Sequence, residues 1–461
     1  MEFSNMHEFA IAIPEGINKQ LTEHLIQSDG DEDLIFALWN PSYGNRRFTA
    51  LIHTIVFPEE GDRQRHGNVS FNSQYLKRVN KIAMEKKMGV CFLHSHPFPG
   101  WQGMSSDDVK AETIMAPGVY TLTEQPLVGM TVGNDGTWSG RIWKHQGNGN
   151  FKMQWAHIVK SAGTSLQPSY NDKLMPKPEY RKEFKRTRTV YGEANHQKIS
   201  RLRVGIVGLG SVGSIVVENL ARMGMENFVL IDFDVIKEHN LDRQLGSTKK
   251  DIGVLKVDVA KRQIKNSATA KTVNIQTWPY NVGQKEGYLA ALDCDVIFSC
   301  VDRPLARHVL NHLAYSHLIP VIDGGIRVSF EEQNFMGADW QFQTVAPERP
   351  CLQCLKAYES SDVALEKSGM LDKPSYLQGL PDHHPLKSNE NIFPFSSHLA
   401  AFEVFHLIAL VTGLGGIYDF GVQRYRFKNG YLSSYDDRKC LKGCSFTKLI
   451  ATGDTILNGI D

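Results

Sequence analysis

The sequence predicts an α/β protein of more than one domain, with a doubly wound parallel sheet in its second half. The chain has 461 residues, and at about 150 residues per domain this length fits roughly two to four domains. Residues 203–234 alternate a strand-like run, a glycine-rich turn, a helix-like run and a second strand-like run. Further strand-like runs, DVIFSCV and IPVIDGG, follow with helical stretches between them. This alternation is typical of a doubly wound sheet.

Residues 1–150 predict a smaller α/β domain. The strand-like runs LIFALWN, FTALIHTIVF and GVCFLHSHP occur together with FNSQYLKRVNKIAMEKK, whose apolar residues recur at helical spacing. The composition then shifts through the tract HQGNGN, the proline-containing segment LMPKPEY and a group of basic residues. We therefore expect a domain at 1–150, a linker at 151–185 and a second domain at 186–461.

The overall charge and hydropathy point away from nucleic acids and membranes. Lys plus Arg number 51 and Asp plus Glu number 50, so the net charge is +1. The chain as a whole therefore has no strong electrostatic field that would attract nucleic acids or membranes. The best apolar run, Leu407–Gly416, is shorter than the roughly 18 residues of a membrane span. The N-terminus is acidic, whereas a signal peptide begins with basic residues. We expect a soluble cytoplasmic protein.

A cluster of metal-ligand residue types follows one predicted strand. His94 and His96 are two residues apart at its end, so both imidazoles point to one side. Pro97 follows them, and the segment SSDD at 105–108 offers a carboxylate, with Asp108 preferred and Asp107 as the alternative. Three N or O ligands with an open fourth position are typical of catalytic zinc, which makes hydroxide available at neutral pH.

The cluster resembles the JAMM/MPN metalloprotease family, whose pattern joins H-x-H-P to S-x-x-D. The resemblance implies an MPN-type fold and the removal of ubiquitin-like proteins from amines. It also implies a general acid/base near the first long strand, for which Glu32 fits and Glu23 is the weaker alternative. Ser105 would steady the tetrahedral oxyanion. The gap between His96 and Ser105 is one residue longer than in the family.

The second half carries a nucleotide-binding motif with additional charged residues. Gly208, Gly210 and Gly213 form G-x-G-x-x-G between a strand and a helix, and Asp232 ends the next strand, where it fits a ribose hydroxyl. Glycines of this pattern alone would suggest a dinucleotide. The set that accompanies them is more specific and consists of Asp234, Asn240, Arg243, Gln244, Lys256 and Asp302.

The string D-F-D-x₅-N-L-x-R-Q resembles the ubiquitin-activating superfamily, which includes the ThiF/MoeB-like adenylyltransferases. The resemblance extends over about residues 185–450. The resemblance implies a Rossmann-like domain in which a protein's C-terminal carboxylate attacks the α-phosphate of ATP. Arg243 and Lys256 would clamp the phosphates, and Asp302 would hold Mg²⁺. Asn240 would orient the triphosphate.

The same resemblance implies an arginine from just before the first strand, which is often supplied across a dimer. Arg188 is the candidate and Arg186 is the next choice. We therefore expect a homodimer.

Four of the seven cysteines form two close pairs, Cys351-x₂-Cys354 and Cys440-x₃-Cys444. Four thiolates close a structural zinc site, and the resembling adenylyltransferases carry one in matching places. Enzymes of the superfamily with a thioester step have a cysteine between these pairs, and this chain has none there. The stretch instead offers other nucleophiles, which are His383, His384, Ser388, Ser396 and Ser397.

Together these features predict a bifunctional enzyme that acts on the C-terminus of a ubiquitin-like protein. The N-terminal half would process precursors or conjugates with zinc, and the C-terminal half would adenylate the tail with ATP and Mg²⁺. By analogy, such fusions resemble bacterial ubiquitin-like conjugation systems, some linked to antiphage defence, and a conjugating enzyme would be a further partner. The alternative is activation of a sulfur-carrier protein in cofactor biosynthesis. A non-catalytic scaffold and a small-molecule adenylyltransferase are the remaining hypotheses.

Overall fold

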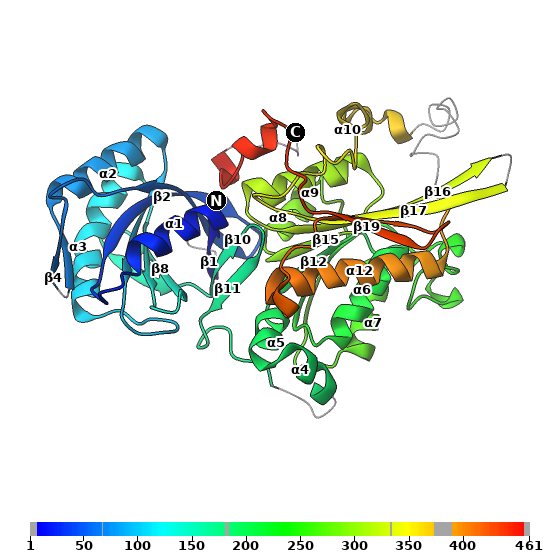
Figure 1. Ribbon diagram of the computed structural model, residues 1–461, viewed down its shortest axis with the longest axis horizontal. Coiled ribbons are helices and arrows are strands. Elements are labelled where there is room, and N and C mark those ends of the chain that lie inside the picture. Colours follow the sequence, from blue (N-terminus) through cyan, green and yellow to red (C-terminus); the bar gives the residue numbers. More distant parts are fainter. Residues whose placement is uncertain (1–6, 67, 180–183, 332–333, 373–389, 456–461) are drawn as a thin grey trace. The chain divides into compact units, whose positions relative to one another are not determined.

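The computed structural model describes residues 7–66, 68–179, 184–331, 334–372 and 390–455 (Figure 1). The chain divides into two compact units. Unit 1 comprises Met1–Pro176, Ser316–Leu318 and Leu449–Leu457. Unit 2 comprises Lys177–Tyr315, Ile319–Lys448 and Asn458–Asp461. Each unit has its own sheet, as an α/β chain of more than one domain requires.

Unit 1 is built on a nine-stranded sheet in the order β11-β10-β1-β3-β2-β6-β7-β8-β9. Its strands are β1 (Glu8–Pro14), β2 (Leu34–Tyr43), β3 (Arg47–Val56), β6 (Gly89–Ser95), β7 (Leu127–Val132), β8 (Trp138–His145), β9 (Phe151–Trp155), β10 (Ile158–Ala162) and β11 (Leu166–Tyr170). A separate hairpin pairs β4 (Arg63–His66) with β5 (Asn68–Phe71). The helices are α1 (Glu15–Leu25), α2 (Ser73–Lys86) and α3 (Ser106–Thr123).

Strand β2 shows why this sheet is covered on both faces. Ile35, Ala37 and Trp39 join one buried cluster together with residues of α1. Leu34, Phe36 and Leu38 join a second cluster together with residues of α2 and α3. Successive side chains of a strand point to opposite faces, so an apolar run such as LIFALW fits a strand that is buried on both sides.

The expected boundary at residue 150 was wrong. Residues 151–170, which we assigned to a linker, form β9, β10 and β11 of the unit 1 sheet. The tract HQGNGN is the turn between β8 and β9, with Gly147 and Gly149 at positive φ. Glycine adopts these angles without steric cost, so the tract marks a turn within the sheet rather than the end of the domain.

Unit 2 has an eight-stranded sheet in the order β14-β13-β12-β15-β16-β17-β18-β19. Five strands run parallel, namely β12 (Arg203–Val207), β13 (Asn227–Ile231), β14 (Asn274–Trp278), β15 (Val296–Ser299) and β16 (Val321–Glu331). The others run antiparallel and are β17 (Asn334–Val345), β18 (Val422–Arg426) and β19 (Tyr431–Tyr435). Strand β12 lies between β13 and β15, so the strand order reverses there, and the predicted doubly wound sheet is confirmed.

The helices of unit 2 are α4 (Lys185–Tyr191), α5 (Glu193–Ser200), α6 (Ser211–Arg222), α7 (Lys256–Ser267), α8 (Lys285–Leu292), α9 (Pro304–Ser316), α10 (Ser360–Lys367) and α12 (Phe393–Thr412). By length and composition α12 could cross a membrane, but 67% of that window is buried inside the protein. Phe395 and Leu399 of α12 pack in a cluster with Trp340 and Phe342 of β17. We therefore interpret α12 as a core helix of unit 2.

Two glycines of unit 1 give a test of its packing. A Cβ on Gly89 of β6 would lie 2.1 Å from the Trp39 ring, whereas a Cβ on Gly118 of α3 would meet nothing within 4 Å. We expect Gly89→Ala to lower the free energy of unfolding by about 1–3 kcal/mol because of overpacking. Gly118→Ala, the control, should raise it by about 1 kcal/mol because alanine favours a helix. Denaturant unfolding of the full chain measures both, and equal effects of the two would contradict this packing.

Candidate metal and nucleotide sites

The structure brings His94, His96 and Asp108 together in unit 1. The Nε2 atoms of the two histidines are 3.2 Å apart. Asp108 lies 3.1 Å from His94 and 3.3 Å from His96, and the ligand atoms of all three lie within 4.8 Å of one another. Asp107, the alternative ligand, is exposed. Two imidazole nitrogens and one carboxylate oxygen at these separations fit a single zinc ion.

Local structure places these side chains. His94 lies near the end of β6 and His96 lies directly after it, and Asp108 is in the first turn of α3. Ser105 caps α3: its hydroxyl accepts a hydrogen bond from the Asp108 amide at 3.1 Å, and its own amide donates to the Asp108 carboxylate at 2.7 Å. This capping box fixes the carboxylate beside the histidines. The structure thus gives Ser105 a capping role, and its expected role at the oxyanion stays a prediction.

Burial and hydrogen bonding shift the pKa of each group in this cluster. Burial lowers the pKa of His94, which favours the neutral form that binds metals. The hydrogen bond with Asp108 raises the pKa of His96. For Asp108, burial acts to raise the pKa, but hydrogen bonds with both histidines lower it overall. Asp108 therefore stays ionised, as a metal ligand must.

Glu32 faces the same cluster from just before β2. It is half-buried, and burial raises its pKa, with smaller electrostatic effects from His96 and Asp108. Glu23, the weaker alternative, is exposed on α1 and lies 3.9 Å from Lys19. Of the two glutamates, Glu32 is the one with the surroundings of a general acid/base.

In unit 2 the glycine motif joins β12 to α6, and two of its glycines are required by close backbone contacts. Gly208 has a φ of +87°, and a Cβ on it would lie 2.4 Å from the Cys300 carbonyl oxygen. A Cβ on Gly213 would lie 2.0 Å from the Gly208 oxygen. A Cβ on Gly210 would meet nothing within 4 Å. The turn leads directly into α6, whose N-terminal amides can bind phosphate.

Asp232 ties this turn to the end of β13. Its carboxylate accepts hydrogen bonds from the amides of Leu209 at 2.6 Å and Asp234 at 2.8 Å. Burial raises its pKa. The structure thus gives Asp232 a supporting role for the glycine turn, and its expected contact with a ribose stays a prediction.

The positively charged residues of the motif, Lys256 and Arg243, each lie close to an aspartate. Lys256 begins α7, and its Nζ is 2.8 Å from Asp234 and 4.0 Å from Asp232. Arg243 lies 2.9 Å from Asp242. Asn240 ends a short 3₁₀ turn, Glu238–Asn240, and its side chain accepts a hydrogen bond from the Lys237 amide.

The remaining expected nucleotide-site residues have more varied surroundings. Gln244 is buried, and its Oε1 has no hydrogen-bond partner among the described residues. Asp302 follows β15 and is exposed to solvent. Arg188 lies on α4, where it pairs with Glu193 at 2.9 Å. Arg188 therefore has a local partner, and its role in catalysis stays a prediction.

A pocket of about 570 Å³ lies beside the ends of β13, β14 and β15. Ligand sites of open α/β sheets lie at the carboxyl ends of the strands, and this volume is in the usual range for a small-molecule site. Sequence analysis assigned no role to its aromatic residues, Phe233 and Tyr280, which each stand two residues after the end of a strand, β13 and β14 respectively. The lining residues are Phe233, Pro279, Tyr280, Asn281, Gln284, Arg303 and Glu366.

The four cysteines also come together in unit 2, as one group of potential metal ligands. The Sγ atoms of Cys351 and Cys444 are 3.7 Å apart. Backbone amides of Cys351, Cys354 and Leu441 point at sulfur atoms of the group, at 3.3 to 3.4 Å. A hydrogen bond from the Cys351 thiol lowers the pKa of Cys440. Four sulfurs supported by amide donors fit a closed structural zinc site.

The alternative nucleophiles receive little support. His383, His384 and Ser388 lie outside the described residues. Ser396 is buried in α12, and Ser397 donates to the Phe393 carbonyl. Burial raises the pKa of Cys300 well above its ordinary value, which suppresses the reactive thiolate.

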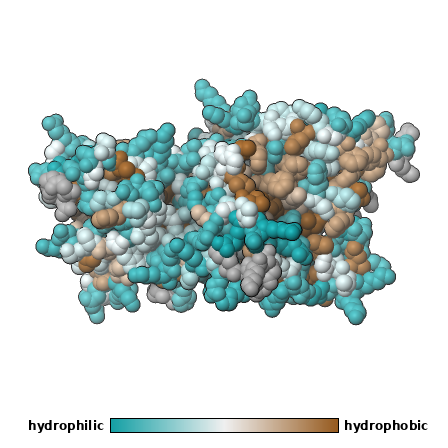
Figure 2. Space-filling model, turned by 60° about the horizontal axis from the view of Figure 1, so that its bottom comes forward, coloured by the Kyte–Doolittle hydropathy of each residue, from teal (hydrophilic) through white to brown (hydrophobic). Residues whose placement is uncertain are grey.

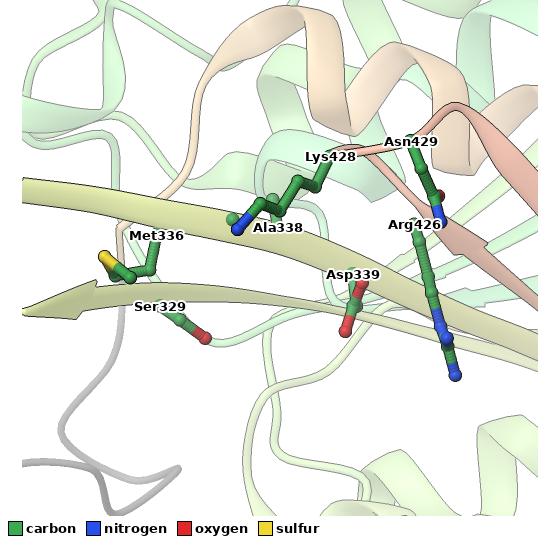
Figure 3. A pocket seen from close by; sticks show the side chains of 8 residues that line it. Ser329, Met336, Ala338, Asp339, Arg426, Lys428 and Asn429 are labelled. Carbon is green, nitrogen blue, oxygen red and sulfur yellow. The ribbon is translucent and has the colours of Figure 1, made fainter.

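A second hollow, of about 670 Å³, lies on the antiparallel part of the unit 2 sheet (Figure 3). Met336, Arg426 and Lys428 are among its lining residues. Three exposed aromatic rings lie beside it, and the ring of Phe335 contacts those of both Phe330 and Phe427. Figure 2 shows hydrophobic residues exposed over part of one face of the molecule.

The family of the protein follows from a match over more than half of its length. The ThiF family model matches residues 184–433. The chain therefore belongs to the ThiF family, and the match covers the glycine turn, Arg243, Lys256 and Asp302. The match begins after the last strand of the unit 1 sheet and does not include His94, His96 or Asp108. The metal-binding cluster of unit 1 is therefore supported by its geometry alone, and the family match gives no support for the expected JAMM/MPN family.

Curated relatives are similar over part of their length. The adenylyltransferase and sulfurtransferase UBA4 of Candida glabrata is 23% identical over 216 residues, which are 46% of this chain and 49% of that protein. The molybdopterin-synthase adenylyltransferase of Escherichia coli is 31% identical over 156 residues, 33% of this chain and 58% of that protein. The SAMP-activating enzyme E1 of Haloferax volcanii is 26% identical over 164 residues, 36% of this chain and 57% of that protein. The chain thus spans less than two thirds of these relatives.

Among solved structures, Escherichia coli MccB with MccA-N7isoASN matches at a TM-score of 0.44 and 18% identity. The match covers 58% of this chain and 75% of that chain.

Metal content tests both clusters. We expect the full chain to retain two zinc ions, with one lost in Cys444→Ser and the other lost in His96→Ala, because each change removes one ligand. Cys294→Ala alters a buried cysteine outside both clusters and should keep both ions. Elemental analysis after dialysis against a weak chelator measures this content. Retention of both ions in the His96→Ala variant would contradict the unit 1 site.

Proposed function

We propose that this protein uses ATP to adenylate the C-terminal carboxylate of a ubiquitin-like or sulfur-carrier protein. The observation that carries the proposal is the arrangement at the carboxyl edge of the unit 2 sheet, where the glycine turn, the Lys256–Asp234 pair and a pocket lie at neighbouring strand ends. Membership of the ThiF family supports the same chemistry.

The reaction would form an acyl-adenylate. A carboxylate oxygen of the partner attacks the α-phosphorus, and the bond from that phosphorus to the bridging oxygen breaks, so pyrophosphate leaves. Negative charge builds up on the phosphate oxygens during this step, and Lys256 and Arg243 supply cations to stabilise it. The exposed carboxylate of Asp302 is free to share Mg²⁺ with the phosphates.

The comparisons favour the sulfur-carrier alternative over conjugation. Relatives named for sulfur transfer and molybdopterin synthesis match this chain, and no cysteine lies between Cys354 and Cys440 to accept a thioester. We therefore place activation of a sulfur carrier first and conjugation of a ubiquitin-like protein second. The exposed apolar rings of Phe330, Phe335 and Phe427 suit a protein substrate better than a small molecule.

Adenylation predicts ATP–pyrophosphate exchange that depends on the carrier protein of the same host. Lys256→Ala and Arg243→Ala should each lower the exchange rate by about 10²-fold or more, because each removes a charge that stabilises the transition state. Lys265→Ala, at the exposed last turn of the same helix as Lys256, should keep the rate. Full exchange by the Lys256→Ala variant would rule out the proposed role of this lysine.

A second function is favoured by the metal cluster of unit 1, and we propose that this unit hydrolyses an acyl–nitrogen bond at the same kind of C-terminus. Zinc bound by His94, His96 and Asp108 would supply a Lewis acid and water of lowered pKa. Glu32 would take a proton from the attacking water and give it to the departing amine. In the sulfur-carrier hypothesis this step would release a carrier from an adduct.

Glu32→Gln tests this function with Glu23→Gln as the matched control, since Glu23 is exposed on α1 and pairs with Lys19. We expect Glu32→Gln to keep its zinc, because it changes no ligand, and to slow cleavage of a carrier–peptide fusion by about 10²-fold or more. Mass spectrometry of the products measures the rate. Cleavage by this variant at the rate of the unaltered protein would exclude Glu32 as the general acid/base.

A further inference from the structure

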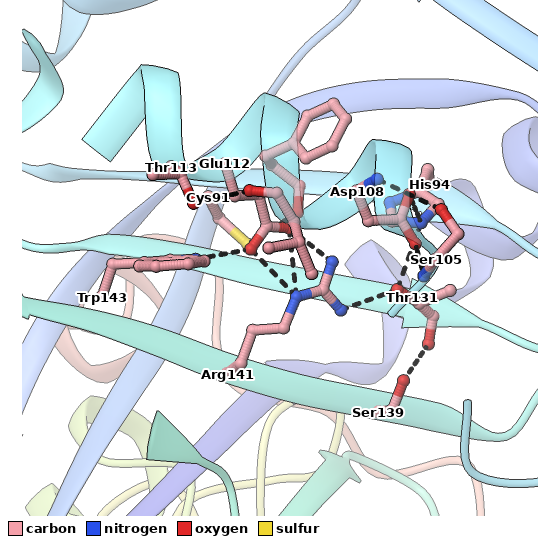
Figure 4. Close-up of polar contacts among 12 residues, drawn as sticks. Cys91, His94, Ser105, Asp108, Glu112, Thr113, Thr131, Ser139, Arg141 and Trp143 are labelled. Atoms are coloured by element: carbon pink, nitrogen blue, oxygen red, sulfur yellow. Dashed lines mark hydrogen bonds and ion pairs between the residues drawn. The ribbon is translucent and has the colours of Figure 1, made fainter. Parts of the chain in front are cut away.

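The candidate general acid/base, Glu32, lies next to a residue that is bonded to the metal-binding strand. The metal cluster joins the end of β6 to the start of α3, where His94 and Asp108 lie together (Figure 4). Burial raises the pKa of Glu32, and the charges of His96 and Asp108 also act on it, so its carboxyl group lies near the cluster. Its place in the fold depends on how the chain before β2 pairs with the end of β6.

The register of these antiparallel strands places Glu32 on the metal side of the sheet. Leu34 of β2 pairs with His94 of β6, so each step back along β2 corresponds to one step forward along β6. Asp33 is therefore opposite Ser95, and Glu32 is opposite the second histidine. Paired residues share a face of the sheet, and successive residues alternate between faces. Glu32 thus shares a face with both histidines, whereas Asp33 and Ser95 share the other face.

Two hydrogen bonds hold Asp33 to Ser95. The Ser95 amide donates to the Asp33 carbonyl at 3.0 Å, as in an ordinary antiparallel ladder. In the other direction the Asp33 amide donates at 2.9 Å to the Ser95 hydroxyl, where a ladder would use a backbone carbonyl. Both residues are buried, so water competes little for either bond. The last pair of the ladder therefore depends on a side chain.

The Asp33 side chain fixes the same residue from a second direction. Its Oδ1 accepts a hydrogen bond from the Leu34 amide at 2.7 Å and forms an ion pair with Arg63, the first residue of β4. A guanidinium nitrogen of Arg63 lies 3.0 Å from Nε2 of His24 on α1. A buried carboxylate needs a charged partner, because its removal from water is costly. Asp33 is thus held by β4 as well as by β6.

These contacts are the fixed point nearest to Glu32. Residues 30–33 belong to no helix or strand, so regular pairing along β2 does not reach Glu32 itself. A slip of one residue at this end of the sheet would turn Glu32 to the opposite face, away from the histidines. Proton transfer needs the carboxyl group within hydrogen-bond reach of the reacting water. The Asp33–Ser95 contacts therefore decide whether Glu32 can act.

We propose that Ser95 and Asp33 are positioning residues that hold Glu32 against the metal cluster for proton transfer. The inference rests on the hydrolytic function proposed above and names two further residues for its site. Neither side chain shares the face of the metal-binding histidines, so both act through Glu32 and not on the substrate or the metal ion.

The test measures how the full chain cleaves a fusion of the host's carrier protein to a short peptide. Ser95→Ala removes the acceptor of the Asp33 amide. We expect kcat to fall by about 10- to 100-fold, because a misplacement of about 1 Å can cost as much. KM and zinc content should stay near those of the unaltered protein, because no substrate contact or metal ligand changes. Ser95→Thr keeps the hydroxyl and should retain most of kcat.

A double-mutant cycle separates positioning from a general loss of stability. In a Glu32→Gln background no acid/base is left to misplace, so Ser95→Ala should cause no further loss of kcat. Ser42→Ala is the matched control, since Ser42 is a buried serine at the other end of β2 whose hydroxyl lies 2.8 Å from His317 Nδ1. This control should keep kcat in both backgrounds.

If Ser95→Ala fails to fold, Asp33→Asn takes its place. Asparagine keeps the amide that bonds to Ser95 and the acceptor for Leu34, but it removes the charge that pairs with Arg63. We expect it to lower kcat, and again to have no effect in the Glu32→Gln background.

Unaltered kcat in the folded Ser95→Ala or Asp33→Asn variant, with Glu32→Gln inactive, would overturn the inference while the hydrolytic function stands. Equal losses in the presence and absence of Glu32 would also overturn it, because the effect would then not pass through this residue. Cleavage by Glu32→Gln at the rate of the unaltered protein would instead remove the proposed general acid/base, and the inference would fail with it.

Discussion

The connection from the end of a strand to the N-terminus of a helix is the constraint on which both sites depend. In unit 2 the turn after β12 is so close to Cys300 and to its own backbone that Gly208 and Gly213 cannot carry side chains. In unit 1 His94 lies near the end of β6 and His96 directly after it, and Ser105 caps α3 with the help of Asp108. Helix N-termini have unpaired amides, so these connections gather polar groups at one edge of each sheet. Phosphate binding and metal binding both require polar groups that are gathered in this way.

The two proposed activities act on the same kind of chemical group. Adenylation activates the terminal carboxylate of a carrier, whereas hydrolysis by unit 1 would return an acylated amine to a free carboxylate. One activity would therefore supply the substrate of the other. The proposal explains why a ThiF-family sequence would be joined to a unit with a metal-binding cluster, and it does so without a thioester-forming cysteine.

Local patterns in the sequence predicted much of the fold and of the candidate sites, because the decisive residues lie close together in the chain. The spacing from Gly208 to Gly213 predicted a strand-to-helix turn, and the structure has one there. The strands β9 to β11 were missed because they are short and are separated by turn residues that resemble a linker. The buried ion pair of Arg141 on β8 with Glu112 on α3 could not be predicted, because 29 residues separate the two and no local pattern joins them. Nor could the spacing show that the Asp232 carboxylate accepts hydrogen bonds from the amides of Leu209, in the glycine turn, and of Asp234.

The claim that both units act on one protein substrate can be tested with the Glu32→Gln variant purified from its native host in the presence of ATP and Mg²⁺. Intact mass spectrometry would identify what is bound, and pyrophosphate exchange with the captured molecule would then be measured. The account predicts a small carrier protein that supports exchange and loses this ability when its C-terminal residue is removed. Capture of a small molecule that supports exchange by itself, with no protein required, would contradict it.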